Sequence, residues 1–239
     1  AWGTDLMYDD GTHGDDVAGD GIYTVVLTIT TGGRYEFKVD DGNWTDPHPP
    51  SNAWIFTTAD NQPIKFTFDT NTYNDGWFPS TLIVNAQDGV TTWTAVGDWQ
   101  GWNPSDPSTV MTPLGGGLYA YDTVIPTAGT HYYKAVRSGT WDAIGPQGGE
   151  GGRSVNTDNL AFTTNSDGQR VCFLADVGRA RIRVTRVLLE APVVLNEFVA
   201  KGTEWIEIFN PLTETVDLSG WTVTSQYGHL TYTIPLGTV

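Results

Sequence analysis

The sequence predicts an all-β protein built from small antiparallel β-sandwiches. Two features support this: short runs of alternating polarity separated by turn residues, and no apolar spacing typical of helices. The chain has 28 Gly, 13 Pro and ten Trp among its 239 residues. Aromatic residues, together with frequent Thr and Val, favour strands over helices. The fold class therefore follows from composition and periodicity together.

An internal repeat predicts the order of the strands. Residues Gly19–Lys38 (GDGIYTVVLTITTGGRYEFK) align without a gap on Gly115–Lys134 (GGGLYAYDTVIPTAGTHYYK). Each copy has a glycine-rich turn, a strand, a Thr- and Gly-containing turn and an aromatic strand ending in Lys. A turn with a Trp follows in each copy, Trp44 or Trp141, and then a strand of alternating polarity, IKFTFD or RVCFLAD. We expect the two copies to form sandwiches of the same kind.

The length of the chain requires more than one such sandwich. A sandwich of this type has about 100 residues, so we expect two tandem immunoglobulin-like domains, at residues 1–80 and 81–187. Residues 188–239 are expected to form part of a third sandwich. Because Tyr23 follows the first residue so closely, the first domain is expected to lack its opening strand. Neighbouring domains are expected beyond both ends.

Charge and apolar content exclude several classes of function. The formal net charge is -16, which argues against nucleic acid as a partner, since such binding depends on Lys and Arg. No uninterrupted apolar stretch is long enough to predict a membrane span. The one cysteine, Cys172, cannot form an internal disulfide. It lies in a strand-like run, which favours a buried, inert thiol over a reactive one.

The sequence lacks the motifs of common catalytic sites. There is no nucleophile elbow, no zinc-binding His-Glu-X-X-His and no phosphate-binding glycine loop. The histidines, His13, His48, His131 and His229, are far apart in the chain. His131 aligns with Tyr35 of the first repeat copy, which favours a packing role. We therefore expect the chain not to be an enzyme.

An acidic loop opens the chain, in the stretch MYDDGTHGDDVAGDGIYT. Its carboxylates are candidate calcium ligands, since calcium prefers oxygen donors: Asp9, Asp10, Asp15, Asp16 and Asp20. Their spacing differs from that of an EF-hand loop. Asp-Gly turns account for the same residues without any ion, so a calcium site and a plain turn are both open.

The second repeat copy resembles a known family. Residues Thr91–Val184, with the Gly-Asp-aromatic-X-X-Trp-Asn-Pro motif at Gly97–Pro104, are similar to the immunoglobulin-like modules that accompany pullulanases and related starch-active enzymes. The resemblance implies a non-catalytic module that binds carbohydrate. The candidate ligand-binding residues are Trp99, Trp102, Asn103, Lys134 and Trp141. Core packing is the alternative for the three tryptophans, because sandwich cores use Trp heavily.

The last segment resembles a second family. Val193–Ser225 is similar to the opening of a lamin tail domain, through Asn196-Glu197, the 204–208 run, Asn210-Pro211 and the 217–221 run. Lamin tail domains are interaction modules, so the resemblance implies adhesion, partner docking or assembly. About half of such a domain is present.

Three further tryptophans, Trp44, Trp54 and Trp77, lie in polar, loop-like stretches and are predicted to be exposed interface residues. We expect an extracellular or cell-surface microbial protein. The leading hypothesis is an accessory module that binds carbohydrate, of the α-glucan class, and spaces other domains. The alternative is a structural subunit of a surface layer, stalk or filament, assembled from copies of itself through contacts between modules and strand addition.

Overall fold

The structure is a computed structural model, and it describes residues 3–78, 81–185, 194–199, 205–209, 218, 221–224, 231–235 and 238. Within these residues the secondary structure is β-strand, apart from two short 3-10 helices, η1 (Asp98–Gln100) and η2 (Pro107–Thr109). Neither is long and apolar enough to cross a membrane. The all-β prediction is confirmed. The chain divides into two compact units, Ala1–Arg186 and Val187–Val239.

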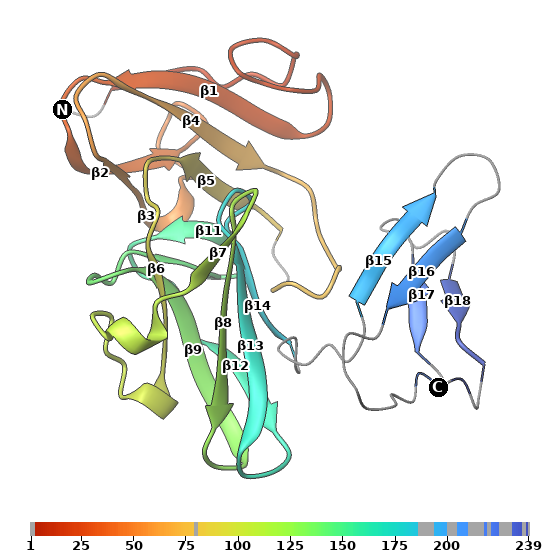
Figure 1. The fold of residues 1–239 in the computed structure, drawn as a ribbon. Coiled ribbons are helices and arrows are strands. Elements are labelled where there is room, and N and C mark those ends of the chain that lie inside the picture. Colours follow the sequence, from red (N-terminus) through yellow and green to blue (C-terminus); the bar gives the residue numbers. More distant parts are fainter. Residues whose placement is uncertain are drawn as a thin grey trace. The chain divides into compact units, whose positions relative to one another are not determined.

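The first repeat copy folds into two strand pairs that face each other. Its strands are β1 (Ile22–Ile29), β2 (Gly33–Val39), β3 (His48–Thr57) and β4 (Gln62–Asp69). β1 pairs antiparallel with β4, and β2 with β3 (Figure 1). Alternation along β4 buries Ile64 and Phe66, as the sequence predicts, and Phe37 of β2 packs edge-on against Phe66 with ring centroids 4.8 Å apart. These contacts form a small core between the two pairs.

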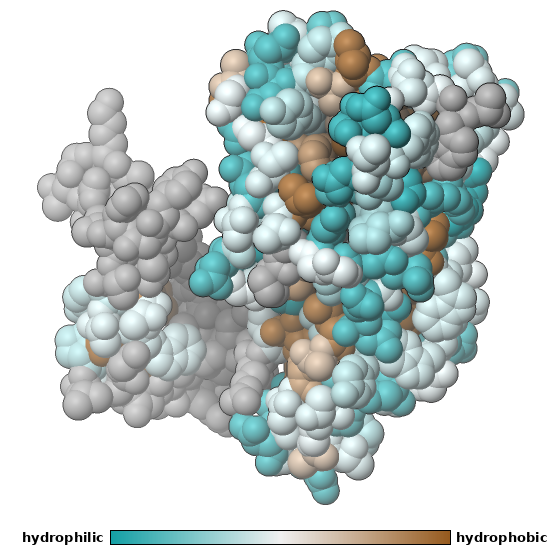
Figure 2. Space-filling view, turned by 180° about the vertical axis from the view of Figure 1, so that it is seen from behind, coloured by the Kyte–Doolittle hydropathy of each residue, from teal (hydrophilic) through white to brown (hydrophobic). Residues whose placement is uncertain are grey.

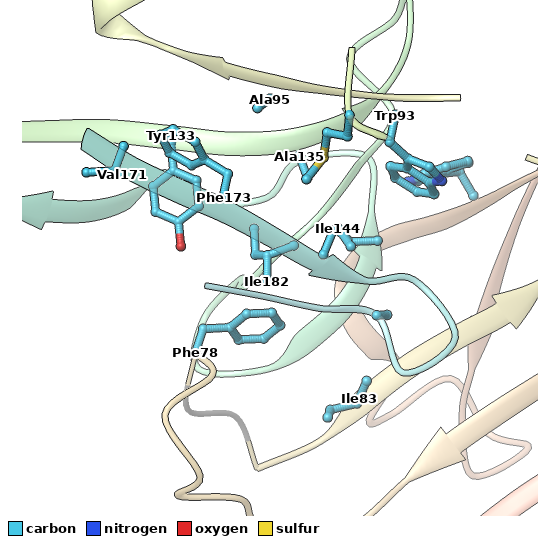
Figure 3. Close-up of a cluster of buried hydrophobic side chains, with 14 of the residues drawn as sticks. Phe78, Ile83, Trp93, Ala95, Tyr133, Ala135, Ile144, Val171, Phe173 and Ile182 are labelled. Carbon is cyan, nitrogen blue, oxygen red and sulfur yellow. The ribbon is translucent and has the colours of Figure 1, made fainter. Parts of the chain in front are cut away.

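The second repeat copy is larger. Its region contains β5 (Ile83–Gln87), β6 (Trp93–Gly97), β7 (Thr112–Gly115), β8 (Leu118–Ile125), β9 (Gly129–Arg137), β10 (Ala143–Ile144), β11 (Gly151–Ser154), β12 (Leu160–Thr164), β13 (Gln169–Asp176) and β14 (Arg181–Thr185). One sheet has the order β14-β13-β8-β7, and β9 of the other sheet pairs with β6, β10 and β12. Figure 3 shows their shared core, in which Tyr133 of β9 meets Phe173 of β13 at a centroid distance of 5.2 Å.

The two copies share local structure as well as sequence. β1 and β8 occupy aligned positions of the repeat, and so do the starts of β2 and β9. The Thr57 hydroxyl donates to the carbonyl oxygen of Gly33 at 3.2 Å, and the Thr164 hydroxyl donates to that of Gly129 at 3.3 Å. Both glycines have positive φ, 150° and 136°, where a side chain would be strained. A threonine at the end of the partner strand, Thr57 or Thr164, therefore makes the equivalent hydrogen bond in each copy.

A continuous sheet joins the two copies. Its strand order is β1-β4-β5-β11-β10-β9-β12, with β5 antiparallel to β4 and parallel to β11. The expected boundary after residue 80 lies between β4 and β5, inside the first compact unit. The expected boundary after residue 187 lies beside the division between the two units.

The described residues of the second unit include two antiparallel strand pairs. β15 (Val194–Val199) pairs antiparallel with β16 (Trp205–Phe209), with a register shift between Leu195 and Glu197, and β17 (Thr222–Thr224) pairs with β18 (Thr231–Thr233). Ile234 is buried. Several residues of the lamin tail resemblance lie outside the described residues: Glu204, Asn210, Pro211, Asp217, Ser219 and Gly220.

Candidate functional site: an exposed tryptophan turn

Two tryptophans at corresponding turns of the repeat are half-exposed. Trp141 has 53% of its surface exposed and Trp44 has 47%. On the face drawn in Figure 2, hydrophilic residues separate small hydrophobic patches. The Trp141 turn, between β9 and β10, is held against the neighbouring loop, because the Gly139 amide donates to the carbonyl oxygen of Pro104 at 2.7 Å. An indole held out on a braced turn is a stacking surface for a flat ligand.

A network of charged side chains begins at the residue after Trp141. The buried Asp142 carboxylate accepts from Arg137 at 2.8 Å and lies 2.8 Å from the Arg34 guanidinium of β2. Arg34 also bonds Glu36 at 2.8 Å, and the amide of Asn52 donates to the other oxygen of Glu36 at 2.6 Å. The hydrogen bond from Asn52, and then that from Arg34, lower the pKa of Glu36. This network joins Arg34 and Glu36 of the first repeat copy to the buried Asp142 of the second.

Sequence reasoning missed this network. Its members come from strands far apart in the chain, and Arg34 and Asp142 are joined only by the fold. One signal was available: Arg34, Glu36 and Lys38 alternate with aromatic and apolar residues in β2, which predicts a polar outer face.

The other tryptophans of the carbohydrate candidate set are partly buried. Trp99 stacks on Phe173 with ring centroids 4.5 Å apart and an angle of 18°, and it packs against the larger core. Trp102 packs against the cluster that contains Val96 and Val136. The packing alternative considered from the sequence accounts for both rings. Because core residues cover part of each indole, less of its surface is open to a ligand.

The two polar candidates of the set are engaged within the fold. The Asn103 side-chain oxygen accepts from the Ser105 amide at 3.0 Å, which forms a local turn. The Lys134 ammonium donates to the carbonyl oxygen of Thr157, and burial lowers its pKa. Among the three tryptophans of this set, Trp141 is thus the exposed one.

The prediction that Trp54 is an exposed loop residue is wrong. The Pro-rich stretch before it belongs to β3, and Trp54 itself is 0% exposed. Its indole nitrogen donates to the carbonyl oxygen of Ala143 at 2.8 Å, and the Arg153 guanidinium lies 4.5 Å from its ring centroid. Trp77 is partly buried, with the Arg183 guanidinium 4.4 Å from its ring centroid.

The acidic loop brings three of its five candidate carboxylates together. One oxygen from each of Asp9, Asp15 and Asp20 lies within 4.8 Å of the others. Asp9 accepts from the amides of Gly19 and Gly21 at 2.7 and 3.1 Å, and Asp15 accepts from that of Gly11 at 2.7 Å. The loop is therefore closed by carboxylate–backbone bonds, and its carboxylates also converge as calcium ligands do.

The other two carboxylates point to different partners. Asp10 accepts from the amide of Thr12 at 2.9 Å and from its hydroxyl, and the hydroxyl bond lowers the pKa of Asp10. Asp16 forms an ion pair with Lys65 at 2.8 Å. The predicted set of five thus reduces to a cluster of three.

Calcium binding remains a prediction, and the loop offers a matched pair of variants to test it. If the cluster binds calcium, calcium at 100 times its Kd stabilises the fold by about 2.7 kcal/mol, measured as a rise in Tm. Asp15→Asn should abolish that rise, whereas Asp16→Asn should retain it, because Asp16 lies outside the cluster. If calcium does not change the Tm of the parent chain, the calcium site is excluded and the carboxylates serve only to close the turn.

The surroundings of Cys172 and His131 indicate packing roles for both side chains. Cys172 is 1% exposed, and burial raises the pKa of its thiol to about 12, which keeps it protonated and unreactive. The ring of His131 lies 3.2 Å from an Asp98 carboxylate oxygen and 2.9 Å from the carbonyl oxygen of Thr127, and it packs near Phe162. Both side chains are buried within the sandwich.

Comparisons with known proteins match the two resemblances predicted from the sequence. Residues 90–182 match the family model described as the pullulanase X25 domain, and residues 189–239 match that of the lamin tail domain. Among solved structures, the chain is similar to pullulanase from Bacillus acidopullulyticus, with 17% identity and a TM-score of 0.33. That similarity covers 96% of this chain and 23% of the pullulanase chain. A comparison with curated proteins found no match.

Proposed function

We propose that this chain is a non-catalytic accessory segment that binds a neutral polysaccharide through the turn of Trp141. The match of residues 90–182 to a pullulanase-associated module supports an accessory role and favours an α-glucan as the ligand class. One observation carries the choice of residue: Trp141 lies inside the matched segment and its side chain is half-exposed. The setting that fits such a ligand is extracellular or at the cell surface of a microbe.

The chemistry around Trp141 fits a sugar. The flat face of an indole packs against the C–H groups of a sugar ring, and nearby polar groups bond its hydroxyls. In the network that begins at Asp142, the Glu36 carboxylate can accept from hydroxyls, and Arg34 and Asn52 can donate to them. The net charge of -16 opposes the approach of an acidic polysaccharide. A neutral glucan offers the C–H faces and hydroxyls that such a surface binds, and it carries no negative charge.

Affinity electrophoresis in gels with starch or pullulan tests this proposal. We expect retardation of the parent chain, and we expect Trp141→Ala to lose at least about 2 kcal/mol of binding free energy, the usual cost of truncating a central aromatic contact. Trp44→Ala is the matched control, since it removes an indole of similar exposure from the other repeat copy. Equal retardation of the parent chain and Trp141→Ala would contradict the assignment.

A second candidate function is assembly into a surface layer, stalk or filament. The exposed indole of Trp44 favours it, because aromatic side chains are enriched in interfaces between proteins. Sedimentation velocity over a range of concentrations distinguishes the two functions. Polymerisation that Trp44→Ala abolishes, without retardation by any glucan, would replace the first proposal with the second.

A further inference from the structure

The outer face of β9 carries a half-exposed tyrosine. Side chains alternate in direction along a strand, and Tyr133 and Ala135 of β9 belong to the larger core. Tyr132, Lys134 and Val136 therefore lie on the other face of the sheet. Tyr132 has 47% of its surface exposed, so its ring is open to a ligand.

Trp102 covers the middle of this outer face. Val96 of β6 lies opposite Lys134. Ala143 of β10 lies opposite Val136. Trp102 packs against Val96, Val136 and Ala143, which form a cluster separate from the larger core. The indole is only partly buried there, so a second ring borders the same face.

Trp141 lies at one end of the outer face. The Arg137 amide donates to the carbonyl oxygen of Asp142 at 2.7 Å, which continues the pairing of β9 with β10 towards the turn. Alternation then places Trp141 on the same side as Ala143. In this register position 141 falls opposite Ser138. At a strand rise of about 3.4 Å per residue, that position is about 20 Å from Tyr132 along β9.

The end of the face at Tyr132 has the groups that a sugar needs. β12 pairs with β9 (Figure 1), and its exposed Ala161 lies opposite Tyr132. The small alanine leaves the side of the ring uncovered. The exposed Thr130 and Thr163 lie opposite each other in the next outward pair, with hydroxyl oxygens 3.4 Å apart. These hydroxyls both donate and accept, so they can bond a sugar whose C–H face packs on the Tyr132 ring.

We propose that Tyr132 is the stacking residue of a second sugar subsite, and that the outer face of β9 binds an extended run of glucan units from Trp141 to Tyr132. This inference rests on the proposed function, because Trp141 holds the other end of the same ligand. It adds the class of glucan: a chain of several units laid along a sheet face. A ligand that reaches both subsites binds more tightly than one that reaches a single subsite, so affinity rises with the length of the glucan.

Calorimetric titration with maltotriose and maltoheptaose tests the inference. We expect the parent chain to bind maltoheptaose at least about tenfold more tightly than maltotriose, since the longer sugar engages both subsites. Tyr132→Ala should remove most of that difference by weakening maltoheptaose binding, and it should leave maltotriose binding at the Trp141 subsite unchanged. Tyr132→Phe keeps the ring and should retain the affinity of the parent chain for maltoheptaose.

Tyr23→Ala is the matched control, because Tyr23 is 41% exposed and lies in the first repeat copy; it should change neither affinity. Three results would overturn the inference: unchanged maltoheptaose binding by Tyr132→Ala, equal weakening of both sugars by Tyr132→Ala, or a Tyr132→Phe variant as weak as Tyr132→Ala. The proposed function survives each of them if Trp141→Ala loses binding. If the parent chain binds neither sugar, the inference and the proposed function both fail.

Discussion

Replacing Asp88 with alanine is expected to destabilise the first compact unit by about 3–5 kcal/mol, because it leaves the buried charge of Arg153 without its partner. The two side chains are 1% and 2% exposed. The Asp88 carboxylate accepts from the Arg153 guanidinium in a bidentate pair at 2.6 and 3.1 Å. A loss of this size is a large fraction of the stability of a typical domain.

The position of this pair explains why its loss affects both repeat copies. Asp88 follows β5, and its carboxylate also accepts from the Phe56 amide of β3 at 2.8 Å. Arg153 lies in β11, donates to Asn85 of β5 at 3.2 Å and lies over the ring of Trp54. The ion pair therefore joins β3, β5 and β11, where the two copies meet.

Urea unfolding followed by tryptophan fluorescence measures the effect. Asp106→Ala is the control, because it removes only local bonds to Ser108 and should cost about 1 kcal/mol or less. The double variant Asp88→Ala with Arg153→Met should be more stable than Asp88→Ala alone, since it removes the unpaired charge. Equal stability of Asp88→Ala and the control would contradict the role of the ion pair.

Trp54→Ala is also expected to cost about 3–5 kcal/mol, the usual range for removing a large buried aromatic side chain. The indole is buried in the larger core beside Trp93, with their ring centroids 5.9 Å apart. The substitution also leaves the carbonyl oxygen of Ala143 without the donor that Trp54 supplies. Loss of the buried indole and loss of this hydrogen bond both destabilise the folded state.

Trp44→Ala provides the comparison, because this indole is 47% exposed. We expect it to change the free energy of unfolding much less than Trp54→Ala, as surface substitutions usually do. Chemical denaturation of the two variants side by side gives the difference. Similar losses of unfolding free energy for the two variants would contradict the core role of Trp54.

Most of the strands follow from local sequence. The alternation in IKFTFD predicts β4 and its buried face, and the repeat alignment places β8 and β9 from β1 and β2. Both patterns depend on neighbouring residues and on the period of a strand. The two family resemblances followed from short motifs in the same way, and the matches to residues 90–182 and 189–239 confirm them.

The environment of each functional candidate depended on contacts between distant residues. Trp44 and Trp54 stand in the same polar stretch of sequence, yet one is half-exposed and the other is closed in by Ala143 and Arg153. In the acidic loop, spacing alone could not separate Asp15, which converges with its neighbours, from Asp16, which pairs with Lys65 of β4.

The sequence by itself thus determined the all-β class, the repeat and the families that its segments resemble, because these are encoded in residues close together along the chain. Only the tertiary structure decided which tryptophans reach the surface, how the two copies share a sheet, and that β6 pairs with β9. The physical reason is that exposure and pairing are set by whatever part of the chain packs alongside, which the local pattern of a strand does not specify.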